Sequence, residues 1–201
     1  INGFLLSKTN SKEDIQYLDN LLTSIEKERG LEIGKFTIIP ILESAKSIVN
    51  INEIALSSNR LIALGFGSED YVSDIKGVRD FQTNLSINFP RQLVPIVARA
   101  HGLEAIDAAY IKVHDLEGLE THLETGKILG YGGMWVLHPK QNELANKILN
   151  KEYDFENLYL IVKYYSESMN NWHLSKNINI NAQQPQLKAG QKNAAGVISP
   201  V

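Results

Sequence analysis

Carboxylate side chains follow two apolar runs of this sequence, at the points where buried strands are expected to end. Glu43 comes directly after the run 36–42, and Glu69 and Asp70 come a few residues after the run 61–66. In folds built from parallel strands, functional groups gather where strands end and loops begin. These acids are therefore the first candidates for chemistry.

Two carboxylates at the ends of adjacent parallel strands lie within a few ångströms of each other and repel, so that one of them would take up a proton. A hard divalent cation removes this conflict. Mg²⁺ typically binds one or two carboxylates, keeps several waters and leaves positions for substrate oxygens. The pair Glu43 and Asp70 therefore predicts a site for Mg²⁺, with Mn²⁺ as a substitute, that could polarise a carbonyl group.

Each acid also has a structural reading. Glu43 could be a first-turn acid that complements the dipole of the following helix. Asp70 could be a helix N-cap or a turn residue, with Glu69 as its solvated neighbour. The sequence alone leaves both readings open.

Other polar residues at expected strand ends are less informative. Asp107, inside an apolar run, is read equally well as a buried partner for a backbone group or Lys and as a functional acid. His138 precedes Pro139, which allows a role in local structure or contact with a ligand. No arrangement suggests a Ser-His-Asp set or a histidine zinc site, and no catalytic acid or base is assigned. Solvated or packing roles are expected for the remaining candidates, His101, His114, His122 and His173.

Apolar runs alternate with amphipathic segments along the chain. Strands are expected at about 4–6, 36–42, 61–66, 104–110 and 133–137. Helices are expected at about 11–29, 45–54, 91–101, 116–129, 140–149 and 155–169. A long polar loop is expected before Pro90. Alternating strands and helices predict an α/β fold with a parallel sheet.

Two familiar parallel folds compete for this pattern. The open doubly wound sheet carries glycines after its first strand, whereas Gly130, Gly132 and Gly133 precede a strand here. The absence of that fingerprint and of a phosphate-binding loop favours the (β/α)₈ barrel. Five βα units are too few to close one, because such barrels typically need about 250 residues. An incomplete barrel is therefore expected.

The composition excludes several classes of protein. The 201 residues carry a formal charge of −3, 43% hydrophobic residues and no cysteine. No apolar run reaches the ~20 residues of a membrane-spanning helix, and the charge gives no footprint for nucleic acid. Disulfides and thiolate chemistry are excluded. Absence of cysteine fits a reducing compartment, and a cytoplasmic location is expected.

Residue 1 is Ile, and the segment 1–8 around the first expected strand already has a strand-like pattern, which indicates a piece of something longer. Three segments are expected: residues 1–150 as part of a barrel, 151–175 as a helical segment, and 176–201 as an irregular tail rich in Asn, Gln and small residues. Docking of the tail on a neighbouring subunit is the alternative.

A series of short motifs occurs in one order. These are Phe4-Leu-Leu-Ser-Lys8, Ser11-Lys-Glu-Asp14, Pro40-Ile-Leu-Glu-Ser44, Gly65-Phe-Gly-Ser-Glu-Asp70, Ala98-Arg-Ala-His-Gly102, Ala105-Ile-Asp107 and Gly130-Tyr-Gly-Gly-Met-Trp-Val-Leu-His-Pro-Lys-Gln141. The succession, over about residues 2 to 150, resembles the citrate lyase beta subunit family, also called the HpcH/HpaI aldolase family. The resemblance implies a (β/α)₈ barrel and an Mg²⁺-dependent carbon–carbon lyase that acts on citryl-, malyl- or citramalyl-type thioesters.

The resemblance also implies roles for individual residues. Glu43 and Asp70 match the family's metal-ligand acids. Glu69 adjoins the loop that faces the oxo-acid carboxylate, and Lys8 matches a Pro-Lys segment in which Ser7 replaces Pro. Near the thioester arm, the matching substrate-binding residues are His138, Pro139 and Gln141.

Partners follow from the same resemblance. An acyl-CoA or acyl-carrier thioester and a small oxo acid are the implied ligands, and a homo-oligomer or a complex with other lyase subunits is the implied assembly. The likeness begins at the family's fourth barrel strand, so its first three strands and their substrate-binding Arg have no counterpart. The family's lid Asp has no counterpart after Lys151 either. Two alternatives to a lyase therefore stay open: a noncatalytic scaffold or subunit of this fold, and a metal-dependent aldolase acting on free oxo acids.

Overall fold

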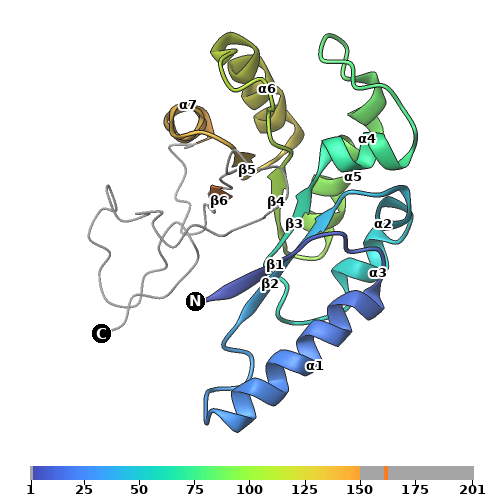
Figure 1. Cartoon of the computed structure of the whole chain (residues 1–201), viewed down its shortest axis with the longest axis vertical. Coiled ribbons are helices and arrows are strands. Elements are labelled where there is room, and N and C mark those ends of the chain that lie inside the picture. Colours follow the sequence, from blue (N-terminus) through green and yellow to red (C-terminus); the bar gives the residue numbers. More distant parts are fainter. Residues whose placement is uncertain (1, 150–160, 163–201) are drawn as a thin grey trace. The chain divides into compact units, whose positions relative to one another are not determined.

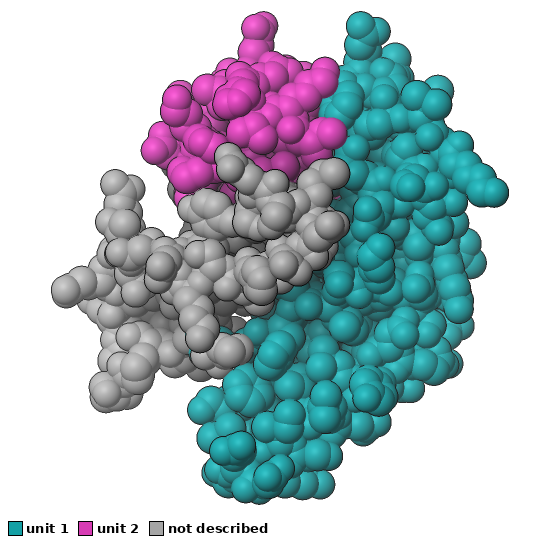
Figure 2. Space-filling view, viewed as in Figure 1, with its two compact units in different colours: residues 1–108 teal, residues 109–201 magenta. Residues whose placement is uncertain are grey.

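The computed structural model describes residues 2–149 and 161–162 (Figure 1). The chain divides into two compact units, residues 1–108 and 109–201, which Figure 2 shows in different colours. The described residues contain five consecutive βα units: three lie in the first unit, the fourth has its strand in the first unit and its helix in the second, and the fifth lies in the second. This succession confirms the predicted α/β class with parallel strands.

The first unit is built on four parallel strands in sequential order. They are β1 (Gly3–Leu6), β2 (Thr37–Leu42), β3 (Ala63–Phe66) and β4 (Glu104–Asp107). Ile38, Leu42, Leu64 and Ile106 are almost completely buried, which fits strands covered on both faces. Because every strand runs in the same direction, the ends that carry Lys8, Glu43 and Asp70 share one edge of the sheet.

The helices of the first unit are α1 (Lys12–Glu28), α2 (Ala45–Val49), α3 (Ile51–Ala55), α4 (Ser68–Asp74) and α5 (Leu85–Ala100). The second unit contains α6 (Leu116–Leu129), β5 (Gly133–Val136), α7 (Pro139–Leu149) and the short β6 (Ile161–Val162), which pairs in parallel with β5.

Helix α1 begins as its sequence predicts. Ser11 is the N-cap, and the Asp14 carboxylate accepts hydrogen bonds from the backbone N–H groups of Asn10 and Ser11, at 2.8 and 3.0 Å. These bonds form a capping box. Ile15 and Leu22 are buried, so the core-facing side of the helix is the apolar stripe read from the sequence.

Three helix predictions are wrong in detail. The helix expected over 45–54 is interrupted at Asn50, whose side chain donates to the Asn10 carbonyl at 3.0 Å instead of facing solvent. Residues 68–74 form α4 in place of a loop, anchored by the buried Val72. Helix α5 starts at Leu85 and contains Pro90, because its buried apolar side provides helical periodicity that outweighs the proline signal.

The segment boundary predictions after residue 150 are largely beyond the described residues. Ile161–Val162 form strand β6, so the helix expected over 155–169 is wrong at these two residues. The rest of that helix and the tail 176–201 lie outside the part of the chain that the structure describes.

A buried network of ion pairs links α1 to the segment that precedes β3. Arg60 donates to Glu26 at 2.6 and 2.8 Å and to Asp19 at 2.6 Å. Glu26 also accepts from the backbone N–H groups of Gly34 and Phe36. The Arg60 hydrogen bond, with help from these N–H groups and against the effect of burial, lowers the pKa of Glu26 from 4.5 to about 2, and the same contacts raise the pKa of Arg60.

Candidate metal centre

The turn after β1 places a backbone N–H against the first candidate ligand. Lys8 has a φ of 54°, in the left-handed region, and the Thr9 hydroxyl donates to the Leu6 carbonyl at 2.9 Å. The Lys8 N–H then points to the carboxylate of Glu43 and donates to its Oε1 at 2.6 Å. A charge-assisted bond of this kind fixes where the carboxylate lies.

Glu43 comes directly after β2 and is only 9% exposed. Gly67 lies so close that an added Cβ would come within 2.7 Å of the Glu43 Cβ and 2.8 Å of its Oε2. Only a residue without a side chain fits there. The glycine after β3 therefore allows Glu43 to pack between the two strand ends.

Asp70 lies in the first turn of α4, the helix that follows β3. Its Oδ2 is 3.5 Å from the Lys8 Nζ, and its side chain is 50% exposed. The neighbouring Tyr71 packs edge-on against Phe66, and burial, with the negative charge of Asp74, raises the pKa of its hydroxyl.

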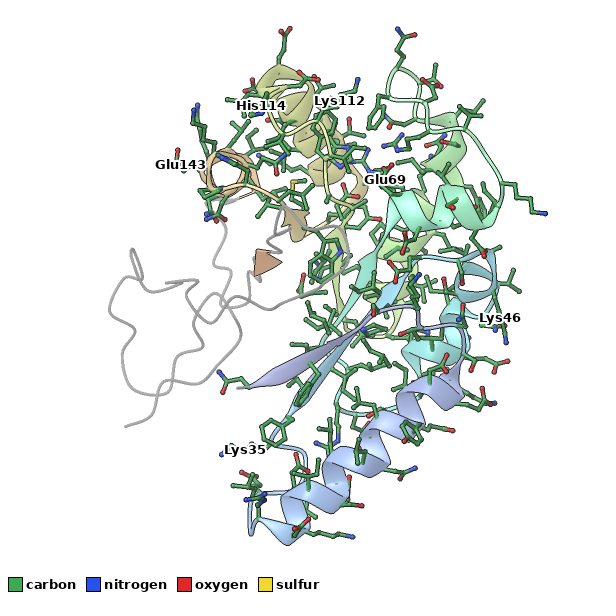
Figure 3. The ribbon with its side chains drawn as sticks, in the orientation of Figure 1. Lys35, Lys46, Glu69, Lys112, His114 and Glu143 are labelled. Carbon is green, nitrogen blue, oxygen red and sulfur yellow. The ribbon has the colours of Figure 1, made fainter. Side chains whose placement is uncertain are left out.

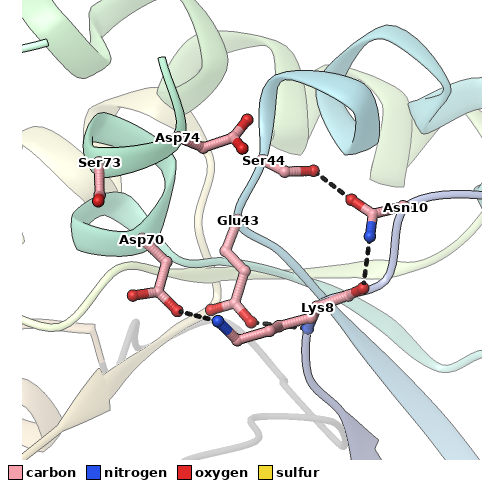
Figure 4. A pocket seen from close by; sticks show the side chains of 7 residues that line it. All are labelled: Lys8, Asn10, Glu43, Ser44, Asp70, Ser73 and Asp74. Atoms are coloured by element: carbon pink, nitrogen blue, oxygen red, sulfur yellow. Dashed lines mark hydrogen bonds and ion pairs between the residues drawn. The ribbon is translucent and has the colours of Figure 1, made fainter. Parts of the chain in front are cut away.

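These groups meet in one cavity of about 270 Å³ within the first unit (Figure 4). The seven residues that line it are Lys8, Asn10, Glu43, Ser44, Asp70, Ser73 and Asp74. The predicted proximity of Glu43 and Asp70 is therefore confirmed, because both line one cavity. Their role as metal ligands stays a prediction.

The opposite side of the cavity is made of polar groups that bind one another. Ser44 donates from its hydroxyl to Asn10 Oδ1 at 2.5 Å, and Asn10 Nδ2 donates to the Lys8 carbonyl at 3.0 Å. The Asp74 carboxylate accepts from the Ala45 N–H at 2.7 Å. These bonds hold the loops after β1 and β2 in place around the two acids.

The helix-terminus roles considered for Glu43 and Asp70 can be checked against the helix starts. Ser44 is the N-cap of α2, and it forms a capping box with Ser47; Glu43 therefore precedes the cap and is not an acid of the first turn of that helix. Gly67 is the N-cap of α4, so Asp70 does not cap it either. Both carboxylates face the cavity (Figure 4).

Glu69, predicted to lie at the substrate loop, is held by an ion pair. Arg79 Nε donates to its Oε1 at 3.0 Å, and the Ser68 hydroxyl donates to the same oxygen. Arg79 also donates to Asn84 Oδ1 and stacks over the ring of Phe81 at 4.2 Å. Glu69 does not line the cavity of Glu43 and Asp70; Figure 3 labels it at the start of α4.

Asp107 has a buried ion pair. Arg91 from α5 donates to both of its oxygens, at 2.6 to 3.1 Å, and the Ala108 N–H donates to Oδ1 at 2.8 Å. The predicted partner type, a backbone group or Lys, was right for the backbone and wrong for the cation. This arrangement favours the structural reading, in which the pair ties α5 to the end of β4.

The remaining predicted residues belong to the second unit. Gln141 is fully buried; its Nε2 donates to the Tyr110 carbonyl and its Oε1 accepts from the Leu137 N–H, both at 2.8 Å. The ring Nδ1 of His138 accepts from the Lys140 N–H, and Pro139 starts α7. Gln141 thus connects the end of β5 to the preceding loop, which is a structural use of its amide.

Two contributors to the site were not predicted. Gly67 could have been found from its position in Gly65-Phe-Gly-Ser, since a glycine directly after a buried strand often marks close backbone approach. Asn10 gave no such signal, because its importance depends on the Ser44 hydroxyl, 34 residues away.

The donor set of this cavity fits a magnesium-type cation. Carboxylate and hydroxyl oxygens line it, and Mg²⁺ needs only one or two carboxylates when water and substrate complete its shell. Among the described residues, no group of three or more His, Cys, Asp or Glu side chains that could hold a metal ion occurs. None of the described helices is long and apolar enough to cross a membrane.

The fold and the cavity define a class: an α/β protein of parallel βα units with paired acids at the carboxyl ends of adjacent strands. The sequence model of the HpcH/HpaI aldolase/citrate lyase family matches residues 1–139. The chain belongs to this family.

Named relatives agree with this assignment. Citrate lyase subunit beta of Haemophilus influenzae is 34% identical over 143 residues, which cover 71% of this chain and 49% of the relative. Human mitochondrial citramalyl-CoA lyase is 31% identical over 148 residues, covering 70% and 43%. The chain spans about half the length of the curated relatives it matches.

Solved structures show the same fold. A lead(II) complex of Haloferax volcanii malate synthase is similar with a TM-score of 0.68 and 25% identity, over 77% of this chain and 46% of that one. The citrate lyase beta subunit of Mycobacterium tuberculosis, complexed with oxaloacetate and magnesium, is similar with a TM-score of 0.62 and 21% identity, over 75% and 62%. These similarities confirm the predicted fold class, an incomplete barrel of the (β/α)₈ type.

Proposed function

We propose that the chain is the metal-binding part of an Mg²⁺-dependent carbon–carbon lyase that cleaves a citryl-, malyl- or citramalyl-type thioester. The observation that carries this proposal is the convergence of Glu43 and Asp70 in one cavity at the carboxyl ends of adjacent parallel strands. Relatives named as citrate lyase subunit beta, citramalyl-CoA lyase and malyl-CoA lyase support the substrate class.

Glu43 and Asp70 would hold the cation, and the chain supplies their positions. The Lys8 N–H orients one Glu43 oxygen, while the absence of a side chain at Gly67 leaves room for the other. Asp70 is half exposed and faces the open side of the cavity. When bound, Mg²⁺ would polarise the oxygens of a 2-hydroxy or 2-oxo acid.

Substrate contacts are proposed for the other predicted residues. The Lys8 ammonium lies at the cavity and has the charge to attract a carboxylate. Glu69 holds Arg79 in place, so its proposed contribution is to fix the loop that follows. His138 and Pro139 are proposed to contact the thioester arm, while Gln141 supports them from its buried position.

The finer details belong to this proposal as well. The thioester carrier is coenzyme A or an acyl-carrier protein, the protein works in the cytoplasm, and it assembles with copies of itself or with other lyase subunits. A noncatalytic subunit of the same fold is the second candidate.

Turnover assays with a substrate panel test the proposal. Citryl-CoA, malyl-CoA and citramalyl-CoA are offered with Mg²⁺, beside free oxo-acid substrates. Cleavage of a thioester that stops with EDTA and with Asp70→Asn is expected, while Glu53→Gln, a surface acid paired with Lys12, leaves the rate unchanged. Oxaloacetate binding without any turnover would favour the noncatalytic subunit, and cleavage of free acids alone would favour an aldolase.

A further inference from the structure

Lys8 contacts two of the three acids that line the cavity, Glu43 and Asp70, with two different groups. Its backbone N–H donates to Glu43 Oε1 at 2.6 Å, and its ammonium Nζ is 3.5 Å from Asp70 Oδ2. Among the seven residues that line the cavity, Lys8 is the one cation. Figure 4 shows its side chain reaching across the mouth between the two carboxylates.

The two contacts differ in how firmly they are held. Glu43 is nearly buried, and the Lys8 backbone sits in a fixed left-handed turn. The Lys8 side chain, in contrast, is 77% exposed, and Asp70 is 50% exposed. An exposed ion pair between flexible side chains contributes little to stability, so the ammonium can leave without disturbing the backbone that positions Glu43.

We propose that Lys8 is a built-in counter-cation of the cavity. Its ammonium compensates the charge of Glu43 and Asp70 when no divalent cation is present, and a divalent cation that binds these acids displaces it. This inference rests on the proposed function, because it takes Glu43 and Asp70 as the metal ligands.

The charges indicate that the Lys8 ammonium and a divalent cation compete for Glu43 and Asp70. A positive charge a few ångströms from a bound divalent cation is repelled by it, and at the same distance this repulsion is about twice the attraction between two unit charges. Lys8 must therefore swing outward, where its length keeps the ammonium at the rim. Removing the ammonium should make cation binding easier by a factor of about five.

Metal titration of a charge-removing variant tests this. Mn²⁺ binding is followed by electron paramagnetic resonance in the wild type, Lys8→Met and Lys12→Met at fixed ionic strength. Lys12 is the matched control, because it pairs with Glu53 at 3.3 Å outside the cavity. Lys8→Met is expected to bind Mn²⁺ about fivefold more tightly, and Lys12→Met to stay near the wild type. Unchanged or weaker binding by Lys8→Met overturns the proposal.

Thermal unfolding supplies a second, independent readout. In EDTA, Lys8→Met should melt slightly below Lys12→Met, because the exposed pair contributes little but Lys8 screens two neighbouring acids, Glu43 and Asp70, whereas Lys12 pairs with Glu53 alone. Saturating Mn²⁺ should remove this difference, since the ion then supplies the charge itself. A deficit of the same size with and without Mn²⁺ would show that Lys8 serves only the fold, and would contradict the proposal.

The metal site and the counter-cation role of Lys8 can be contradicted separately. If wild type, Lys8→Met and Lys12→Met all take up no Mn²⁺, the metal site is wrong, and the proposed function and this inference fall together. If the wild type binds Mn²⁺, Glu43→Gln abolishes that binding and Lys8→Met does not change it, the metal site stands and the counter-cation does not.

Discussion

A single missing side chain shapes the candidate site at the residue scale. Any Cβ at Gly67 would lie 2.7 Å from the Glu43 Cβ, a separation that packed carbon atoms do not adopt. The contact involves the root of the Glu43 side chain, which cannot rotate away. Gly67 therefore determines where the buried carboxylate can lie.

Gly67→Ala should push Glu43 out of its position against the Lys8 N–H. Overpacking of this kind costs about 1–3 kcal/mol of stability, and we expect at least a tenfold loss of Mn²⁺ affinity in addition. Gly77→Ala is the matched control, because an added Cβ there meets only side-chain atoms, of Ile75 at 3.2 Å and of Val72 at 3.6 Å, and none of Glu43. Denaturant unfolding and Mn²⁺ titration measure the two effects. Equal Mn²⁺ affinity in both variants would show that Gly67 does not position Glu43.

At this scale, the sequence predicted correctly those neighbours that follow from a residue's position at the end of a strand. Glu43 and Asp70 could be paired because parallel strands end at one edge. It missed Asn10 and the Arg91–Asp107 pair, because these contacts depend on which side chains face each other across loops and helices. Periodicity carries no information on such contacts.

At the scale of elements, the ion pairs of Arg60 with Glu26 and Asp19 connect a helix to the sheet. They join α1, through Glu26 and Asp19, to the residue just before β3. A buried charge that loses its partner is strongly unfavourable. The alignment of α1 with the sheet therefore depends on all three groups.

Arg60→Leu leaves the buried Glu26 without its cation. We expect it to destabilise the protein by about 3–5 kcal/mol, measured by urea unfolding. Arg99→Leu is the control, since Arg99 forms an exposed pair with Glu104 and such pairs contribute about 0–1 kcal/mol. Similar losses in the two variants would mean that the Arg60 network adds nothing to stability.

The same network predicts a pH dependence. Because the pKa of Glu26 is about 2 in the folded protein and 4.5 when unperturbed, its ionised form stabilises the fold above pH 4.5. This contribution is lost as the pH falls from 4.5 towards 2. Glu26→Gln should flatten that part of the stability curve, followed by urea unfolding at successive pH values. An unchanged slope in Glu26→Gln would contradict the assignment.

Some helix boundaries could be predicted from the sequence, and others could not. The ends of α6 were predicted correctly, because Asp115 caps its first turn and Gly130 ends it in the left-handed region. The break at Asn50 was missed, since it is stabilised by a hydrogen bond to Asn10 in a distant loop. Local capping signals are visible in a sequence, and tertiary ones are not.

At the scale of the whole molecule, one side of α1 is unusually apolar. Tyr17, Leu21 and Ile25, spaced four residues apart, are 75%, 46% and 38% exposed. They form a stripe along the helix, while Asp19 faces the Arg60 network on its other flank. Exposed apolar stripes favour association.

We therefore expect copies of this chain to associate through the α1 stripe. Leu21→Glu should shift the protein towards smaller species in light scattering, because it places a charge in the middle of the stripe. Val49→Glu, at an exposed position of α2, is the control and should leave the distribution unchanged. A wild-type protein that is monomeric at high concentration would rule out this interface.

The central claim is that Glu43 and Asp70 hold one divalent cation between them. The most direct measurement is the stoichiometry and affinity of Mn²⁺ binding in the wild type, Glu43→Gln, Asp70→Asn and the surface control Glu53→Gln. One Mn²⁺ per chain is expected in the wild type and Glu53→Gln, with a loss of at least tenfold in affinity in each of the other two variants. Binding that survives both Glu43→Gln and Asp70→Asn, or no binding in the wild type, would contradict the claim.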